Sequence, residues 1–327
     1  MRPVPFLRVF SKIVCLGTFF LIFVGGLVKS TESGLAVPDW PLSYGTLFPP
    51  MVGGVFYEHG HRMVAAVIGF LMLCLTISLG YIEKRRWVKR LGFAALGMVI
   101  LQGILGGITV LFFLPTPVSI AHGLLAQTFF ILTVILAYTQ SLERYHRTPH
   151  KEIESPRILC INFIFVMLIY LQLFLGALMR HTGSGLAIPD FPKMGDQWIP
   201  LFNDAMFDWI NNRRFMMEME PVTAGQVIVH FCHRFGAFII FIFSVVLSYF
   251  NLKYSQQSLI HRTVFSLNGI LVIQIVLGAM TILSKKESFL TSAHVAIGAA
   301  LLGLSVLLLL RCAPLSWHEF KQNLLKT

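Results

Sequence analysis

The stretch "GLVKSTESGLAVPDWP" (residues 26–41) recurs as "ALMRHTGSGLAIPDFP" (residues 177–192), and each copy directly follows an apolar run. When both copies are extended by one residue, ten of 17 positions are identical. The two prolines near the end of each copy exclude a helix there, because proline donates no backbone hydrogen bond and restricts the residue before it. We therefore expect two equivalent structured loops within an internally repeated fold.

The apolar composition defines the class of protein. Hydrophobic residues make up 56% of the 327 residues, and the mean hydropathy is +0.74, whereas soluble domains are about 45–50% apolar. The apolar residues come in blocks of about 20, the length of a helix that crosses a bilayer. The composition predicts an all-α, multi-pass integral membrane protein and excludes a soluble domain.

The expected spans are 11–29, 62–82, 91–112, 118–139, 158–178, 231–251, 263–283 and 290–310. We expect the first span to be retained rather than cleaved as a signal peptide, because it is too long and too well continued.

The formal net charge of +11 is unevenly distributed. Most of the lysines and arginines lie in the N-terminus, the C-terminal tail and the segments 83–90, 140–157 and 252–262. By the positive-inside rule these parts are cytoplasmic, so both termini lie inside and the two repeated loops lie outside. We interpret the basic excess as a topology signal and not as a patch for nucleic acid or lipid headgroups.

Five cysteines are present, at positions 15, 74, 160, 232 and 312. None lies in an expected outer loop, and none pairs at the spacing of a metal site. We therefore expect no structural disulfide on the outer side.

The two halves of the chain match span by span. The further matching pairs are "HRMVAA" (61–66) with "HRFGAF" (233–238), "LQGILGGIT" (101–109) with "IQIVLGAMT" (273–281), and "AHGLLA" (121–126) with "AHVAIG" (293–298). The offset grows from 151 to 172 residues, which indicates a 21-residue insertion within 193–229. Four spans per half give a parallel repeat, because both halves start on the same side of the membrane. We expect two four-helix bundles, 1–150 and 151–327, related by a pseudo-twofold axis.

Glycines gather near the outer ends of the expected spans, at positions 25, 26, 106, 107, 176 and 278. Small residues let two helices approach closely. A flat ligand that needs clearance from the backbone would use the same residues, and the sequence leaves both interpretations open.

Four histidines recur at the same spacing in the two halves. His61 and His122 are 61 residues apart, and so are His233 and His294. A lone histidine in an apolar bundle is usually a core residue with a satisfied hydrogen bond, because an unpartnered polar ring is costly there. The repeated pair instead favours one bis-histidine haem iron site per half, since zinc would need further nitrogen or sulfur ligands.

Charged residues flank these histidines differently in the two halves. Arg62 and Arg234 follow the first histidine of each pair, where they could bind haem propionates or extend to the outer surface. Glu58 lies one helical turn before His61, whereas His230 holds the corresponding place in the second half. Glu58 could be a helix N-terminal charge or an acid–base group beside the ligand. This difference suggests that the first half carries out the chemical step and the second half transfers electrons.

Together these motifs resemble the haem A synthase family of cytochrome oxidase assembly, over about residues 10 to 312. The resemblance rests on "STESGLAVPDWP", on "EHGHR" and "HFCHR", and on the paired "AHGLL" and "AHVAI". It implies oxidation of the C8 methyl of haem O to a formyl group, which gives haem A for terminal oxidases. Two successive hydroxylations would give a gem-diol that loses water.

The resemblance also implies a role for each matching residue. His233 and His294 would hold a haem b cofactor for electron transfer in the C-terminal half. His61 and His122 would bind the substrate haem O in the N-terminal half, and Glu58 matches the family's functional glutamate. The implied partners are haem O synthase, subunits of the terminal oxidase and an unidentified electron acceptor, in a bacterial cytoplasmic membrane or a mitochondrial inner membrane.

One departure from the family pattern concerns the first outer loop. Some bacterial members carry a cysteine pair there, and residues 29–60 contain no cysteine. The chain therefore resembles the branch that lacks this pair. The main alternative function is a non-catalytic dihaem electron-transfer cytochrome, which explains the four histidines equally well but not the acid in only one half. A haem carrier and a transporter are further alternatives.

Overall fold

The computed structural model of the chain describes residues 4–146 and 155–313. The expected boundary between the halves and the C-terminal tail lie outside the described residues. The described part is helical and contains no strand. Its helices are α1 (Pro5–Ser30), α2 (Gly54–Ile82), α3 (Arg86–Leu111), α4 (Thr116–Thr139), α5 (Leu142–His146), α6 (Pro156–His181), the 3-10 turn η1 (Ser184–Leu186), α7 (Asp204–Phe215), α8 (Ala224–Tyr254), α9 (Ser258–Leu283) and α10 (Ser288–Cys312).

Eight helices in the described part of the chain are long and apolar enough to cross a membrane, which confirms the eight expected spans. Most of them extend beyond the predicted bounds, because polar residues continue the helix past the apolar core. The largest differences are at the starts of α2 and α8, which begin at Gly54 and Ala224 rather than at 62 and 231. His61 and His233 therefore lie about two turns inside their helices instead of at the first turn.

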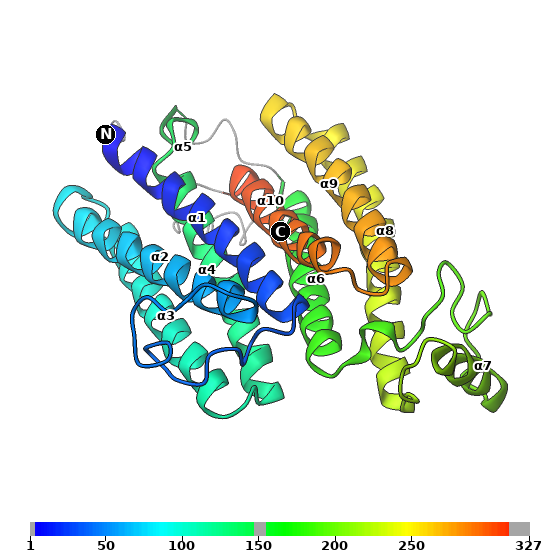
Figure 1. Ribbon diagram of the computed structural model, residues 1–327. Coiled ribbons are helices and arrows are strands. Elements are labelled where there is room, and N and C mark those ends of the chain that lie inside the picture. Colours follow the sequence, from blue (N-terminus) through cyan, green and yellow to red (C-terminus); the bar gives the residue numbers. More distant parts are fainter. Residues whose placement is uncertain (1–3, 147–154, 314–327) are drawn as a thin grey trace.

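The helices form two groups of four that lie side by side (Figure 1). In the first group α1, α2, α3 and α4 pack in chain order, and α1 closes the bundle against α4. In the second group α6, α8, α9 and α10 do the same, and α10 closes against α6. The groups meet where α10 packs against α1 and α4, and where α4 packs against α6. The pseudo-twofold relation between the bundles stays a prediction.

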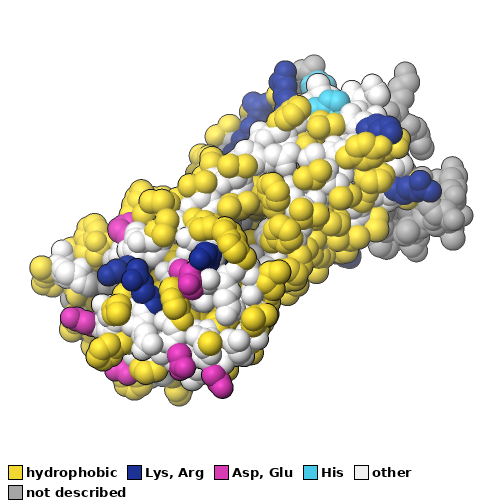
Figure 2. Space-filling view, turned by 90° about the vertical axis from the view of Figure 1, so that its right-hand side faces the viewer, with side chains coloured by type: hydrophobic (Ala, Val, Ile, Leu, Met, Phe, Trp, Pro, Cys, Tyr) yellow, Lys and Arg dark blue, Asp and Glu magenta, His cyan; other side chains and the backbone are white. Residues whose placement is uncertain are grey.

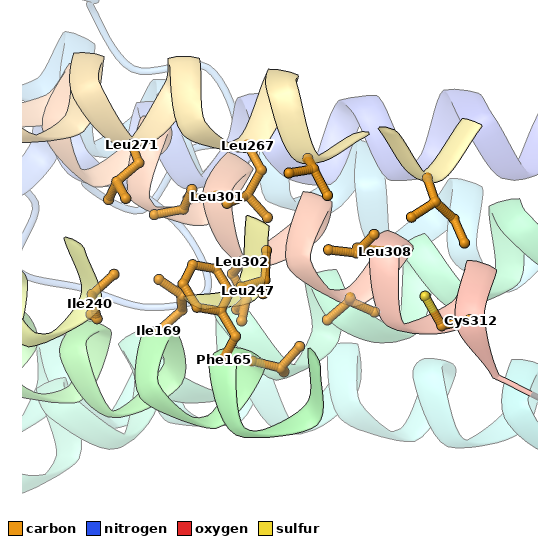
Figure 3. Packing of buried hydrophobic residues seen from close by; sticks show 14 of the residues in the cluster. Phe165, Ile169, Ile240, Leu247, Leu267, Leu271, Leu301, Leu302, Leu308 and Cys312 are labelled. Carbon is orange, nitrogen blue, oxygen red and sulfur yellow. The ribbon is translucent and has the colours of Figure 1, made fainter. Parts of the chain in front are cut away.

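Each bundle has an apolar interior. In the C-terminal bundle Phe165, Leu247, Leu267 and Leu302 are fully buried between their four helices (Figure 3). In lipid, helix association depends on van der Waals packing rather than on the hydrophobic effect, because lipid tails are as apolar as leucine. A cavity left by truncating such a residue removes these contacts.

A few polar contacts tie the helices together on the α5 side of the molecule. Asn162 and Asn251 exchange side-chain hydrogen bonds of 3.2 and 2.9 Å inside the C-terminal bundle. The two bundles are linked by an ion pair of 2.7 Å between Arg311 on α10 and Glu143 on α5. Nearer the middle of the spans, the hydroxyls of Thr128 and Tyr170 lie 2.7 Å apart across the α4–α6 contact.

The surface is banded along the direction of the helices. Apolar side chains cover the middle of the face shown in Figure 2, and charged side chains lie at its two ends. In this view the acidic groups gather at the end that carries α7. The insertion in residues 193–229 thus forms part of one polar end and contains α7, a helix that was not expected from the sequence.

Candidate functional site

The first repeated loop is fastened to the start of α2. The Glu58 carboxylate accepts a hydrogen bond of 2.8 Å from the backbone N–H of Val37, and the Arg62 guanidinium donates to the carbonyls of Asp39 and Leu42 at 2.7 and 2.8 Å. The Asp39 carboxylate accepts from the backbone N–H groups of Gly45 and Tyr44. These bonds to its charged form, led by that from Gly45, lower the pKa of Asp39.

The second repeated loop is fastened to α8 in the same manner. The backbone N–H of Ile188 donates to Nδ1 of His230 at 3.1 Å, and Arg234 donates to the carbonyls of Asp190 and Lys193, both at 3.0 Å. Buried residues of α7, including Met206, pack against this loop and α8. Each loop therefore forms a cap over one end of one bundle, the end at which α2 or α8 begins.

Glu58 and His230 occupy corresponding places beneath the two caps. Each is buried, and each accepts one backbone hydrogen bond from the loop above it. Only Glu58 also forms an ion pair, at 2.6 Å to Arg62 one turn further along α2. Because a neutral imidazole can make the same loop contact, the fold does not require a carboxylate at position 58.

The structure brings His233 on α8 and His294 on α10 together. Their ring centres are 6.4 Å apart, with planes inclined by 75°. Two imidazoles that bind one metal ion from opposite sides, each through a bond of about 2 Å, have ring centres about 6 Å apart. Nδ1 of His294 lies 3.1 Å from the Gln274 carbonyl, which orients the ring, and its Nε2 lies 3.5 Å from the side-chain amide nitrogen of Gln274.

His61 and His122 also lie close enough to interact electrostatically. Nδ1 of His122 is buried without a hydrogen-bond partner among the described residues. The His122 carbonyl accepts a hydrogen bond of 3.1 Å from Gln102, whose position in the repeat corresponds to that of Gln274. An orphaned buried imidazole nitrogen is expected where a metal ligand belongs.

Each of the four histidine rings rests against a glycine of the preceding span. A Cβ atom added to Gly25 would lie 3.1 Å from Nε2 of His61, and one added to Gly278 would lie 3.0 Å from Cε1 of His294. The same contacts join Gly106 to His122 at 3.5 Å and Gly176 to His233 at 3.1 Å. These four glycines give room to the imidazoles. Gly26 instead serves close helix packing, since its Cβ would lie 3.3 Å from that of Ser292 on α10. The described residues fit a bis-histidine haem site in each bundle.

The sequence matches known proteins along nearly all of its length. Residues 8–306 match the model of a family described as cytochrome oxidase assembly protein. The chain belongs to this family. A relative named "Heme A synthase" from Halalkalibacterium halodurans is 28% identical over 299 residues, which cover 88% of this chain and 91% of the relative. A relative with the same name from Lysinibacillus sphaericus is 25% identical, and the match covers 98% of this chain and 99% of the relative. Another from Rickettsia prowazekii is 26% identical, and the match covers 90% of this chain and 94% of the relative.

Sequence reasoning missed several polar side chains in this member of the cytochrome oxidase assembly family. Gln172 donates to the His233 carbonyl at 2.7 Å, and Gln102 and Gln274 contact the histidines on α4 and α10. A usable signal was present, because Gln102 and Gln274 recur at one position of the repeat inside apolar spans. His59 was also missed; its Nδ1 lies 2.8 Å from the Ser43 hydroxyl under the first cap.

Proposed function

We propose that this chain is a haem A synthase that oxidises the C8 methyl group of haem O to a formyl group. Three similarities support the proposal: the family, the names of relatives that match over most of their length, and the four histidines with their glycines. The observation that carries it is the unequal pair beneath the caps, with buried Glu58 in one bundle and His230 in the other.

In this proposal the N-terminal bundle holds the substrate. His61 and His122 bind the iron of haem O, and the glycines beside them keep the backbone clear of the rings. The first cap closes the outer end of this bundle through Val37 and Arg62, which limits the access of bulk water. Glu58 lies one turn from His61, where it can accept a proton released during oxidation or orient a water molecule.

The C-terminal bundle holds a haem b between His233 and His294. When bound, this haem supplies one-electron redox chemistry that removes electrons from the substrate. The Gln172 amide, 3.2 Å from Nδ1 of His233, and the Gln274 backbone carbonyl, 3.1 Å from Nδ1 of His294, hold the two histidine rings in place. Arg62 and Arg234 remain candidate propionate partners, although both donate to loop carbonyls in this structure.

We place both termini in the cytoplasm and both caps outside, in a bacterial cytoplasmic membrane or a mitochondrial inner membrane. Haem O synthase and the terminal oxidase are the expected partners that supply the substrate and take the product.

The alternative function is a dihaem electron-transfer cytochrome. The pigment extracted from the purified protein distinguishes the two functions. Haem O, its C8 alcohol or haem A alongside haem b supports the synthase. Haem b as the only haem, from cells that make haem O, contradicts the synthase and supports the cytochrome.

A further inference from the structure

We propose that Arg180, in the last turn of α6, binds a propionate carboxylate of the haem held by His233 and His294; this inference rests on the haem sites proposed above. Arg180 lies where the two bundles meet. Its Nη2 donates to the Gly26 carbonyl at 2.6 Å and to the Ser30 hydroxyl at 2.9 Å, both on α1.

No carboxylate of the described residues 4–146 and 155–313 balances the charge of Arg180. Arg62 and Arg311, two other arginines on membrane-spanning helices, form ion pairs with Glu58 and Glu143. Among the residues that the structure describes, no acidic side chain pairs with Arg180, and both of its acceptors are neutral. A guanidinium has five N–H donors, and a charge withdrawn from water is costly unless it is paired. An anion is therefore expected at this position.

The surroundings of Arg180 carry more basic groups. The His181 ring interacts electrostatically with Lys29, Arg180 and His122. Lys29 holds the place in the first repeat that Arg180 holds in the second, at the offset of 151 residues. Lys29 and Arg180 form a basic cluster, because Arg180 donates to the hydroxyl of Ser30, the residue after Lys29.

The position of the cluster identifies the anion. Gly176, one turn before Arg180 on the same face of α6, rests against the ring of His233, one of the two rings that would hold the C-terminal haem. The Ser30 hydroxyl, which accepts from Arg180, also accepts a hydrogen bond of 3.0 Å from Ser292 of α10, two residues before His294.

The chemistry of the anion follows from the haem itself. A haem presents two propionate carboxylates at one edge, and a guanidinium binds a carboxylate in a bidentate manner. The carbonyls at the end of α1 supply only a partial negative charge. Arg62 and Arg234 already donate to two or more loop carbonyls each, whereas Arg180 contacts one carbonyl and one hydroxyl.

The test is a redox titration of the haem in the purified membrane protein, with haem content measured on the same samples. A guanidinium beside the propionate favours the ferrous haem. We expect Arg180→Gln to lower the midpoint potential by about 59 mV, a tenfold change in the ratio of ferrous to ferric haem. Arg180→Lys keeps the charge and should return the potential toward that of the wild type.

Two control variants separate this role from a structural one. Ser30→Ala removes a hydrogen bond of Arg180 but keeps its charge, and Arg213→Gln removes an exposed charge on α7. Both should leave the potential unchanged. If Arg180→Gln loses the haem while Arg180→Lys and Ser30→Ala keep it, the carboxylate contact is also supported.

Two results overturn the inference while leaving the haem sites intact. One is an unchanged midpoint potential and haem content in Arg180→Gln. The other is a shift of the midpoint potential in Ser30→Ala equal to that in Arg180→Gln, which would show that Arg180 only holds α6 against α1. If the wild type carries no six-coordinate haem that His294→Ala removes, the haem sites themselves are wrong and the inference falls with them.

Discussion

At the scale of single residues, Glu58 and His230 separate what the fold needs from what the chemistry needs. Both side chains accept a backbone hydrogen bond from a cap, Glu58 from Val37 and His230 from Ile188. A contact that two different side chains can make does not explain the choice of either. We therefore attribute the carboxylate of Glu58 to the reaction proposed for its bundle.

Glu58→Gln tests this attribution. The amide oxygen of glutamine can still accept from Val37, so the cap should stay in place while the proton acceptor is lost. We expect haem A production to fall by roughly 10²-fold or more, with haem b still bound and haem O still able to bind. The measurement is the ratio of haem O, its alcohol and haem A in cells with matched protein levels.

His230→Gln is the matched control for that variant. It changes the corresponding residue of the other bundle and should leave haem A production near that of the wild type. Near-normal haem A in Glu58→Gln would show that Glu58 is only a charge at the start of a helix.

His294→Ala tests the ligand pair in the C-terminal bundle. It removes one of two imidazoles whose ring centres are 6.4 Å apart. We expect the purified variant to remain inserted in the membrane but to lose most of its six-coordinate low-spin haem, as judged by its absorption spectrum. Wild-type haem content and spectrum in this variant would contradict the assignment of the pair.

The sequence was sufficient to pair these histidines, because the spacing of 61 residues recurs in both halves. It was not sufficient to find Arg180 or Gln172, because their partners lie on other helices. Arg180 contacts a helix that is 150 residues away in the chain, and only packing shows that it pairs with no acidic side chain in the described part of the chain.

At the scale of helices, apolar composition predicts the existence of the spans better than their ends. A helix in lipid must satisfy its own backbone, so each long apolar run becomes a helix. The ends depend on polar residues such as those in "EHGHR", which the caps hold in helical positions. Helix α7 could not be predicted from hydropathy, because its buried side chains Met206 and Ile210 pack on the second cap and not in a membrane-spanning bundle.

Glu83 provides a test at this scale. It lies in the turn after α2, where burial alone would raise its pKa, but hydrogen bonds from Arg85 and Gln140 outweigh burial and lower the pKa to about 2. The ionised carboxylate therefore joins the α2–α3 turn to the end of α4. Its contribution is fully present above the ordinary pKa of a glutamate, about 4.3, and is lost as the pH falls toward 2.

We expect Glu83→Gln to lower the thermal unfolding temperature of the detergent-solubilised protein at pH 7. The difference from the wild type should shrink as the pH falls from about 4.5 toward 2, because the wild-type carboxylate then becomes protonated. Unfolding followed by circular dichroism across this pH range measures it. A difference that is the same at every pH would show that the charge of Glu83 contributes nothing to stability.

At the scale of the whole molecule, two four-helix bundles share one contact surface formed by α1, α4, α6 and α10. This arrangement followed from the repeat, because four spans per half return the chain to the same side of the membrane. The two halves differ where the 21-residue insertion adds α7 to the second cap, at one end of the C-terminal bundle.

Topology is testable with fused reporters. Basic residues dominate the segments between α2 and α3, between α4 and α6 and between α8 and α9, so we expect these segments and both termini in the cytoplasm. Of two reporters fused after Thr327, the one that functions in the cytoplasm should be active and the one that functions in the outer compartment should be inactive. Activity of a reporter that requires the outer compartment would contradict this orientation.

The most direct test of the proposed function is the conversion of haem O in cells. The chain is expressed with a haem O synthase in bacteria that make no haem A of their own, and extracted haems are separated by chromatography. We predict that haem A and the C8 alcohol of haem O appear with the wild-type chain and are absent with His61→Ala at a matched protein level. Haem O that stays unconverted by the folded, haem-containing wild-type protein would contradict the proposal that this chain is a haem A synthase.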